Sequence, residues 1–422
     1  MRALQLIALT AALGASVSFS IAQERRPSLT TLYNGGSYGS VIFGQNGALV
    51  GTGESGTVFE LTPPGSPGGA WTETVLHNFT GVNGDGLYPS GSPVRSESAA
   101  LYGTTQEGGT ANLGTVYELV PPASPGGAWT EAVLYSFMGG SDGSYPYTSL
   151  VIGKGGALYG TTAVGGDGGN PVGCFGLGCG TVFELTPPVS PGVTWAETVL
   201  YRFTGGNDGS GPSASPVIGP GGQLYGTTEY GGASSDGAVF ELTPPASPGG
   251  TWTETVLHAF TGQNGDGINP SADLVIGNNG ALYGTTLNGG TSGVGTVFEL
   301  TPPVSPGDAW AETVLYSFVG GSGGSGPMGG VVMNQAGVLY GTTLNFGASK
   351  SCPGLDCGTV YALQPPASPG GAWTEFVLHN FAGGSDGAGP QASLVIGKGG
   401  ALYGTTTVDG PAHAGTVFEL TP

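Results

Sequence analysis

The sequence predicts an all-β fold: a seven-bladed β-propeller of four-stranded blades, with the ring closed by the N-terminal strand, which completes the last blade. Three observations carry this prediction. A unit of 52 to 66 residues recurs along the 422-residue chain, which indicates a repetitive architecture. Each unit holds four short segments rich in Val, Thr, Tyr, Phe and Trp, residues that suit β-strands. The chain also begins with the fourth of these segments and ends with the third.

The four segments, named A to D, are predicted to form four antiparallel strands. Residues 149–162 read "SLVIGKGGALYGTT" and contain segments A ("LVIG") and B ("ALYGTT"). Residues 56–79 read "GTVFELTPPGSPGGAWTETVLHNF" and contain segments C ("GTVFEL") and D ("WTETVLHNF"). Segment A is apolar throughout, as expected of a strand buried on both faces. The Gly-rich residues between A and B predict a tight hairpin, and the Pro-rich stretch between C and D predicts a longer turn.

The two ends of the chain predict that the ring is closed. Segments A, B and C occur seven times, whereas the Trp-marked segment D occurs only six times. The stretch Ser28–Gly36, "SLTTLYNGG", resembles a segment D without its Trp, so we expect it to pair beside Gly415–Leu420. Closure in this way leaves no exposed sheet edge at the join. An open β-solenoid, which would leave two ragged ends, is the alternative fold.

The repeated motifs resemble a known family. The pattern "GGALYGTT", then a Gly-containing loop, then "GTVFELTPP" is similar to the Gloeo/Verruco (GloVer) repeat of exported bacterial proteins, and the resemblance covers essentially residues 23–422. It implies export and a repeat architecture. The motif has no assigned chemistry, so the resemblance implies no catalytic residues.

The N-terminus predicts export. Residues 1–22 have the basic start, apolar run and small-residue "SIA" end of a signal peptide, which would leave residues 23–422 as one propeller domain. A retained membrane anchor is the alternative. We therefore expect a secreted protein, extracellular or periplasmic, without membrane insertion and monomeric.

The charge of the chain excludes two classes of partner. It has 8 Lys and Arg against 28 Asp and Glu, a formal net charge of −20. Binding of nucleic acid depends on Lys and Arg that neutralise phosphates, so nucleic acid is not an expected partner. An anionic membrane surface is disfavoured for the same reason.

Residues that recur in every blade are interpreted as scaffold. The Gly of "LYGTT" leaves room for a close neighbour, its two Thr hydroxyls can bond across strands, and the Trp of segment D is expected to pack between blades. Carbohydrate stacking is the alternative role for these Trp side chains. The Glu of "VFEL" and the Glu of segment D are interpreted as solvated or hydrogen-bonded positions at the blade edge.

Function is therefore expected where the repeat varies, in the B–C loops on one face of the ring. One-off polar residues gather in these loops, with Arg95 in segment A as a cation beside the channel. Candidate catalytic residues are Glu54, Glu107, Glu229, Asp236, Asp409 and His413. Candidate ligand-binding residues are Arg95, Gln106, Glu107, Glu229 and Tyr230. The alternative role of all of them is solubilising the loops.

Four cysteines lie in two of the B–C loops with one spacing, C-x4-C. An even number of cysteines in an exported protein predicts disulfides, Cys174–Cys179 and Cys352–Cys357. A zinc site is the alternative, but it would have to join thiols from two distant blades.

The D–A loops repeat an Asp–Gly pair, which is first of all a turn signal. Calcium would need six to eight oxygen ligands, and each loop offers one carboxylate with Asn or Ser. We therefore predict no metal and no cofactor, with calcium as the alternative.

Two classes of function remain open. The first is an exported binding or interaction module for a neutral extracellular polysaccharide or an envelope protein. The second is a secreted polysaccharide-active enzyme, a glycoside hydrolase or lyase, whose paired carboxylates lie on the B–C face. The sequence favours the first class, because no acid–base pair stands out.

Overall fold

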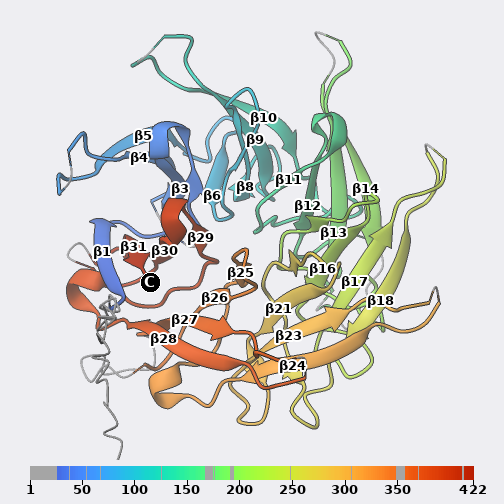
Figure 1. Cartoon of the computed structure of the whole chain (residues 1–422). Helices are drawn as coiled ribbons and strands as arrows, with labels where there is room; N and C mark the ends of the chain where they lie inside the picture. Colours follow the sequence, from blue (N-terminus) through green and yellow to red (C-terminus); the bar gives the residue numbers. More distant parts are fainter. Residues whose placement is uncertain are drawn as a thin grey trace, which may run out of the picture.

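A computed structural model describes residues 26–422, apart from 38, 54, 67, 125, 167–173, 175, 191–193, 248, 306, 348–356, 369 and 411–412. The predicted signal peptide at residues 1–22 lies outside the described residues. Seven four-stranded antiparallel sheets stand side by side around a central axis, so the predicted seven-bladed propeller is confirmed (Figure 1). The described part of the chain contains short 3₁₀ turns but no α-helix, and none of its helices could cross a membrane.

Each blade is a meander with strand A innermost and strand D outermost. Blade 1 contains β2 (Ile42–Phe43), β3 (Leu49–Gly53), β4 (Thr57–Thr62) and β5 (Thr72–Asn78). Blade 2 contains β7 (Val94–Arg95), β8 (Leu101–Gly108), β9 (Thr115–Val120) and β10 (Thr130–Ser136), with β6 (Gly86–Pro89) paired to β8. Blade 3 contains β11 (Val151–Ile152), β12 (Leu158–Thr162), β13 (Thr181–Thr186) and β14 (Ala196–Arg202).

The remaining blades repeat this order. Blade 4 contains β15 (Val217–Ile218), β16 (Leu224–Thr228), β17 (Ala238–Thr243) and β18 (Thr253–Ala259). Blade 5 contains β20 (Val275–Ile276), β21 (Leu282–Thr286), β23 (Thr296–Thr301) and β24 (Ala311–Ser317). Blade 6 contains β25 (Val332–Met333), β26 (Leu339–Thr343), β27 (Thr359–Gln364) and β28 (Thr374–Asn380). Blade 7 contains β29 (Val395–Ile396), β30 (Leu402–Thr406), β31 (Thr416–Thr421) and β1 (Ser28–Tyr33).

Short elements mark the connections. Three 3₁₀ turns form A–B hairpins: η1 (Gln45–Gly47), η2 (Lys154–Gly156) and η5 (Lys398–Gly400). Two others lie in D–A loops: η3 (Gly321–Gly323) and η4 (Gly384–Asp386). In the loops entering blade 5, β19 (Gly267–Ile268) pairs with β22 (Asn288–Gly289), so a D–A loop lies beside a B–C loop. The B–C and D–A loops therefore share one face, as the strand order predicts.

The ring closes as predicted. Strand β1 pairs antiparallel with β31, with Leu29 opposite Leu420 and Thr30 opposite Glu419, and Figure 1 shows the two strands side by side. The first strand of the chain thus covers the edge that the last strand would otherwise expose.

Aromatic rings pack the blades against one another. The ring of Phe137, at the end of strand D in blade 2, lies 5.2 Å from that of Phe183 in strand C of blade 3, and the same pair recurs around the ring. Trp195 lies 6.0 Å from Tyr102 of the preceding blade, so the predicted role of Trp between blades is confirmed.

The Gly of "LYGTT" is required because a larger residue would collide with a neighbouring side chain. Gly160 lies opposite Phe183 in the ladder, and a Cβ at this glycine would come 2.6 Å from the Phe ring. The close neighbour that the sequence predicts is therefore an aromatic ring of the same blade. The Glu of "VFEL" accepts a hydrogen bond from the Tyr of "LYGTT", as Glu118 does from Tyr102 at 2.8 Å.

Candidate functional site

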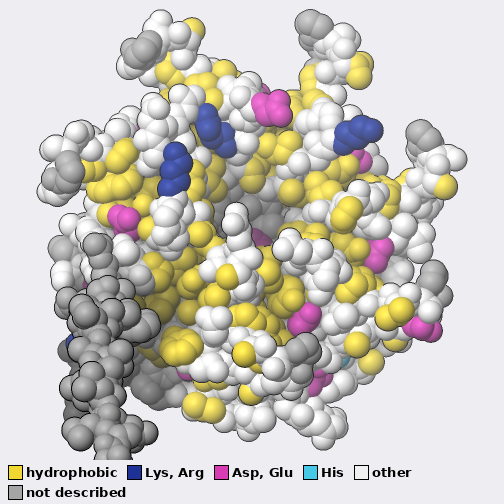
Figure 2. All heavy atoms as spheres, viewed as in Figure 1, with side chains coloured by type: hydrophobic (Ala, Val, Ile, Leu, Met, Phe, Trp, Pro, Cys, Tyr) yellow, Lys and Arg dark blue, Asp and Glu magenta, His cyan; other side chains and the backbone are white. Residues whose placement is uncertain are grey.

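The centre of the ring contains a small polar cavity. Its volume is about 160 Å³, and residues that precede strand A in all seven blades line it. Figure 2 shows the molecule from the face of the A–B hairpins and C–D turns, where it is hollowed at its centre and charged side chains are few and scattered. One position of the lining is Ser in five blades, Asp in blade 5 and Gly in blade 6: Ser40, Ser92, Ser149, Ser215, Asp273, Gly330 and Ser393.

Threonines of strand B hold these inner loops in place. The first Thr of "LYGTT" donates a hydrogen bond to a backbone carbonyl in the inner loop of the next blade, at 2.7–3.4 Å. The pairs are Thr104–Thr148, Thr161–Ala214, Thr227–Ala272, Thr285–Gly329, Thr342–Ala392 and Thr405–Gly39. A buried hydrogen bond at each of these seams fixes the position of the cavity wall. This confirms that the repeated Thr pair belongs to the scaffold.

Asp273 is the one carboxylate among the described residues that line the cavity. Its Oδ1 accepts a hydrogen bond of 2.7 Å from the backbone N–H of Ser215 in the preceding blade. Burial raises the pKa of the Asp273 carboxyl, and the hydrogen bond from Ser215 opposes this shift. Asp273 is not among the residues predicted from the sequence. Its signal was the single acid at a position that the other blades fill with Ser or Gly.

Two hydroxyls of the cavity wall have no partner among the described residues. The Oγ atoms of Ser213 and Ser271 are buried and make no hydrogen bond. Unpaired buried hydroxyls are uncommon in folded proteins and often mark a position occupied by water or a ligand. The cavity therefore offers hydroxyl groups and one carboxylate to a polar molecule.

The rim of blade 4 brings three predicted residues together. The side chain of Tyr230, half exposed, is hydrogen-bonded to Glu229, and this contact raises the pKa of the Tyr230 hydroxyl to about 12. Asn269 joins this pair to Asp236, because its Nδ2 donates to the Glu229 carbonyl at 3.0 Å and its N–H donates to the Asp236 carbonyl at 2.8 Å. An exposed aromatic ring thus stands beside a carboxylate at the face of the B–C loops.

The rim of blade 2 carries the second predicted pair. Gln106 and Glu107 lie near the end of strand β8, half-buried, and Glu107 is opposite Leu87 in the ladder with β6. Burial raises the pKa of the Tyr147 hydroxyl, and a hydrogen bond to Gln106 opposes this shift. Since Tyr147 also lines the central cavity, this rim is continuous with the cavity.

The other predicted residues lie elsewhere. Asp409 and His413 lie in the B–C loop of blade 7, both with positive φ angles, of 60° and 56°. Glu54 lies outside the described residues. None of Glu107, Glu229, Asp236, Asp409 and His413 lines the central cavity. The structure thus distributes the predicted acids over blades 2, 4 and 7.

The expectation that Arg95 shares the rim with these residues is wrong. Arg95 is opposite Leu101, the first residue of strand B, so it stands at the A–B end of the blade. It lines a groove with Pro63 and Pro122 of two C–D turns. The reason is the length of strand A: its two residues run away from the D–A loop, and Arg95 is the second of them.

One predicted disulfide is present. Cys174 and Cys179 are bonded within the B–C loop of blade 3, with Cα atoms 5.2 Å apart, and both pack against the core beside Val182. The bond anchors a long loop at the rim. Cys352 lies outside the described residues, so Cys352–Cys357 stays a prediction.

Solved structures with a similar fold are distant in sequence. A putative 6-phosphogluconolactonase from Bacteroides uniformis aligns with a TM-score of 0.50 and 15% identity over 87% of this chain and 89% of its own. A putative oxidoreductase (glucose dehydrogenase) from Thermus thermophilus aligns with a TM-score of 0.43 and 16% identity over 94% of this chain and 100% of its own. The calcium structure of a Trichoderma reesei carbohydrate-active enzyme of family AA12 aligns with a TM-score of 0.44 and 12% identity over 94% of this chain and 95% of its own. At these identities the likeness concerns the fold alone.

The sequence comparisons are more specific. No curated protein matches the chain. The model of the Gloeobacter/Verrucomicrobia repeat matches residues 25–265 and 173–418, which together cover nearly all of the propeller. The chain therefore belongs to the Gloeobacter/Verrucomicrobia repeat family.

Proposed function

We propose that this protein is an exported binding module that holds a neutral polysaccharide at the mouth of the central cavity, on the face of the B–C and D–A loops. The observation that carries the proposal is the cavity itself: a ring of serine hydroxyls with one carboxylate, Asp273, and two unpaired hydroxyls. Sugar hydroxyls both donate and accept hydrogen bonds, so they complement hydroxyls and a carboxylate.

The rim supplies the second kind of contact that a sugar requires. The exposed ring of Tyr230 offers an apolar surface, and Glu229 beside it offers an acceptor for hydroxyl groups. A few polar groups around an apolar surface are typical of small-molecule sites. An envelope protein is the alternative ligand for the same face.

Charge supports a neutral ligand. The chain has a formal net charge of −20, so a polyanion would be repelled over much of the surface. The Cys174–Cys179 bond supports export, because disulfides persist in oxidising compartments.

A hydrolase is the second candidate. Asp273 is a carboxyl group whose pKa burial raises, as expected of a proton donor. Most glycosidases use two carboxylates that flank the bond to be cleaved. Since the other described lining residues carry no carboxylate, we favour binding.

The test is a glycan array with a turnover assay on any glycan that binds. We compare the parent with Asp273→Ser, which introduces the residue that five other blades carry, and with Tyr230→Ala. Asp273→Ser should weaken binding about tenfold or more, since a hydrogen bond to a charged group contributes roughly 1.5–3 kcal/mol. Tyr230→Ala should weaken binding by a similar factor, since burying a large apolar side chain contributes roughly 1.5–3 kcal/mol. Arg95→Ala is the control on the opposite face and should leave binding unchanged.

Two results would overturn the proposal. One is a glycan that binds the parent, Asp273→Ser and Tyr230→Ala equally well but fails to bind Arg95→Ala. The other is steady release of shortened glycan by the parent, lost in Asp273→Ser, which would establish the enzyme instead.

A further inference from the structure

Two of the seams between neighbouring blades bring a His, an Asp and a Glu together. The His ends strand D of one blade, the Asp lies in the D–A loop that follows, and the Glu comes from strand D of the next blade. The two sets are His77, Asp85 and Glu131, and His258, Asp266 and Glu312. In each set, one nitrogen and two carboxylate oxygens lie within 4.8 Å of one another.

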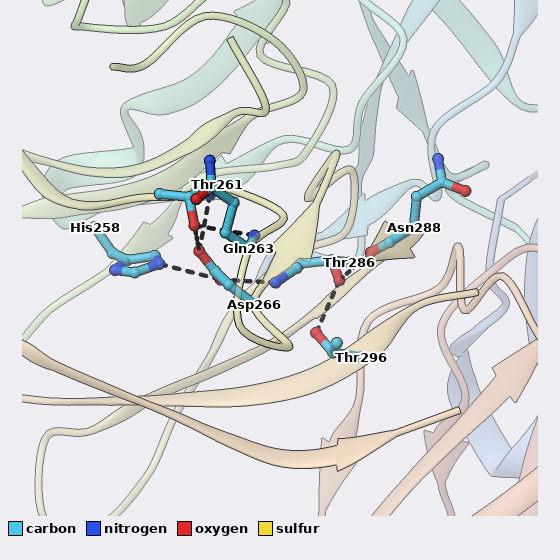
Figure 3. Close-up of polar contacts among 8 residues, drawn as sticks. His258, Thr261, Gln263, Asp266, Thr286, Asn288 and Thr296 are labelled. Carbon is cyan, nitrogen blue, oxygen red and sulfur yellow. Dashed lines mark hydrogen bonds and ion pairs between the residues drawn. The ribbon is translucent and has the colours of Figure 1, made fainter. Parts of the chain in front are cut away.

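The loop holds each Asp in a defined orientation. Oδ2 of Asp266 accepts hydrogen bonds of 2.8 Å from both N–H and Oγ1 of Thr261, and its Oδ1 lies 3.5 Å from Nε2 of His258 (Figure 3). Asp85 repeats this arrangement: Thr80 donates twice to Oδ2 at 2.7 Å, and Oδ1 lies 3.6 Å from Nε2 of His77. One carboxylate oxygen of each Asp is thus directed at an imidazole nitrogen.

All but one of the atoms that face one another are unpaired; the exception is Oδ1 of Asp266, which accepts a hydrogen bond of 2.7 Å from the backbone N–H of Gly267. Nε2 of His77, Oδ1 of Asp85 and Oε1 of Glu131 are buried and have no hydrogen-bond partner among the described residues, and the same holds for Nε2 of His258 and Oε1 of Glu312. The separations of 3.5 and 3.6 Å exceed the roughly 2.7–3.2 Å of an N–H···O hydrogen bond. Buried polar atoms without partners are costly, so each seam is suited to a cation that all three atoms could bind.

Other seams of the ring provide an internal comparison. Where Tyr replaces the His, its hydroxyl donates to the Asp, as Tyr135 does to Asp142 at 2.9 Å and Tyr201 to Asp208 at 3.1 Å. A phenol hydroxyl supplies a proton there, whereas a neutral imidazole supplies a lone pair. The Glu at these seams also has an unpaired oxygen, so the His is what distinguishes the two sets.

Two further seams lack one member. In blade 5, Gly323 stands in place of the Asp, and Tyr316 donates to Glu375 at 2.8 Å. In blade 6, His379 contacts Asp386 at 3.1 Å, but Leu29 of β1 stands where the other blades carry the Glu. Among the described seams, only the two sets named above are complete.

We propose that each complete set binds one divalent transition-metal ion, with Zn²⁺ as the best fit. One imidazole nitrogen and two carboxylate oxygens are ligands that Zn²⁺ accepts. In a tetrahedron with bonds of about 2.1 Å, neighbouring ligand atoms lie roughly 3.4 Å apart, close to the His–Asp separations here. Calcium takes six to eight oxygens and does not suit this set. Each ion would join the outer strands of two adjacent blades.

The test is calorimetric titration of the chelator-treated, exported form of the full chain with ZnCl₂. We expect two equivalents for the parent, one for His77→Tyr and none at these sites for the double variant His77→Tyr/His258→Tyr. Tyr is chosen because blades 2, 3 and 5 carry it at this position, so the variants keep a side chain that the fold already accepts. The melting temperature should rise with Zn²⁺ in the parent and not in the double variant.

His379→Tyr is the matched control. It removes a His at the same repeat position but from a seam without the Glu, so it should leave two equivalents. Binding that does not saturate, or binding that is unchanged in the double variant, would overturn the proposal, since it would reflect general attraction to an acidic surface. A loss of Zn²⁺ in His379→Tyr as large as in His77→Tyr would overturn it as well.

Discussion

The hydroxyl of Thr405 in β30 donates a hydrogen bond of 3.1 Å to the carbonyl oxygen of Gly39, which is 366 residues away in the sequence. The contact joins blade 7 to the inner loop of blade 1, so it lies at the point where the ring closes. It repeats the Thr–carbonyl contact seen within the chain, for example Thr285 with Gly329 at 3.2 Å. The closing seam is therefore built like the seams between consecutive blades, with β1 added on the outside.

Closure can be tested by removing its parts. Deletion of residues 23–36 removes β1 and exposes the edge of β31, so the melting temperature should fall sharply. Thr405→Val removes only the inner hydrogen bond and should lower the free energy of unfolding by about 1 kcal/mol. Thermal and denaturant unfolding measure both, with Thr285→Val as the matched control. A deletion variant as stable as the parent would show that ring closure contributes nothing to stability.

The sequence predicts the ring because strand number and order follow from counting segments, and the incomplete units at the two ends complement each other, as expected of a closed ring. Contacts between blades are harder to predict from the sequence. Asp85 and Glu131 belong to different units and meet through the angle between two blades, which no spacing within one unit reveals. Asp273 lies just before strand A, outside the variable B–C loops in which the sequence predicts function, so it is not among the predicted residues. Arg95 was assigned to the wrong end, since a strand of two residues gives little indication of which end a side chain faces.

Blade 4 lacks a hydrogen bond that other blades have. In five blades the second Thr of "LYGTT" pairs with the first Thr of strand C at 2.8–2.9 Å: Thr105–Thr115, Thr162–Thr181, Thr286–Thr296, Thr343–Thr359 and Thr406–Thr416. In blade 4 the partner of Thr228 is Ala238, and the Thr228 hydroxyl is buried without a hydrogen bond. Ala238→Thr should therefore raise the free energy of unfolding by about 1 kcal/mol.

Ala238→Val separates the hydrogen bond from the added volume, because Val has the shape of Thr without the hydroxyl. Urea unfolding of both variants should show a gain for Thr and no comparable gain for Val. An equal gain would indicate that improved packing, and not the hydroxyl pair, stabilises this position.

Replacing either of two buried tyrosines with phenylalanine is expected not to destabilise the protein. Tyr117 and Tyr361 occupy the position that is Phe in the other blades, are fully buried, and have hydroxyls without a hydrogen-bond partner among the described residues. Tyr117→Phe and Tyr361→Phe should leave stability unchanged or raise it by about 1 kcal/mol, since an unpaired buried hydroxyl is removed. The contrasting control is Tyr102→Phe, which removes a hydroxyl bonded to Glu118 and should destabilise the protein. Chemical unfolding should give opposite signs for the two kinds of change.

The disulfides should stabilise the loops that carry them. Closing so short a ring contributes roughly 2 kcal/mol in the chain-entropy model, so Cys174→Ser/Cys179→Ser should lower the free energy of unfolding by about that amount. Peptide mapping of protein recovered from the exported compartment should find Cys174–Cys179 and Cys352–Cys357. Bonds between the two loops, or free thiols, would contradict the pairing.

Stability should fall as the pH rises from about 4.5 to about 7, and two of the seam carboxyls, Glu197 and Glu254, should contribute to this fall. Burial raises the pKa of Glu197 to about 7; the negative charge of Asp142 adds to this shift, and the positive charge of Arg202 opposes it. Burial, together with the negative charge of Asp208, raises the pKa of Glu254 to about 7. Both groups face the hydroxyl of a seam tyrosine, Tyr135 and Tyr201 respectively, whose pKa is raised as well.

The sign follows from proton binding. Between these pH values the folded chain retains protons that the unfolded chain releases, so the stabilisation is complete below about 4.5 and is lost as the pH passes about 7. Glu197→Gln and Glu254→Gln mimic the protonated groups and should raise the melting temperature at pH 8 while changing it little at pH 4.5. The exposed Glu97, changed to Gln, removes the same charge away from the seams and controls for the net charge of −20. If Glu97→Gln flattens the pH dependence as much as the seam variants do, the general repulsion of an acidic surface, and not these two carboxyls, is its cause.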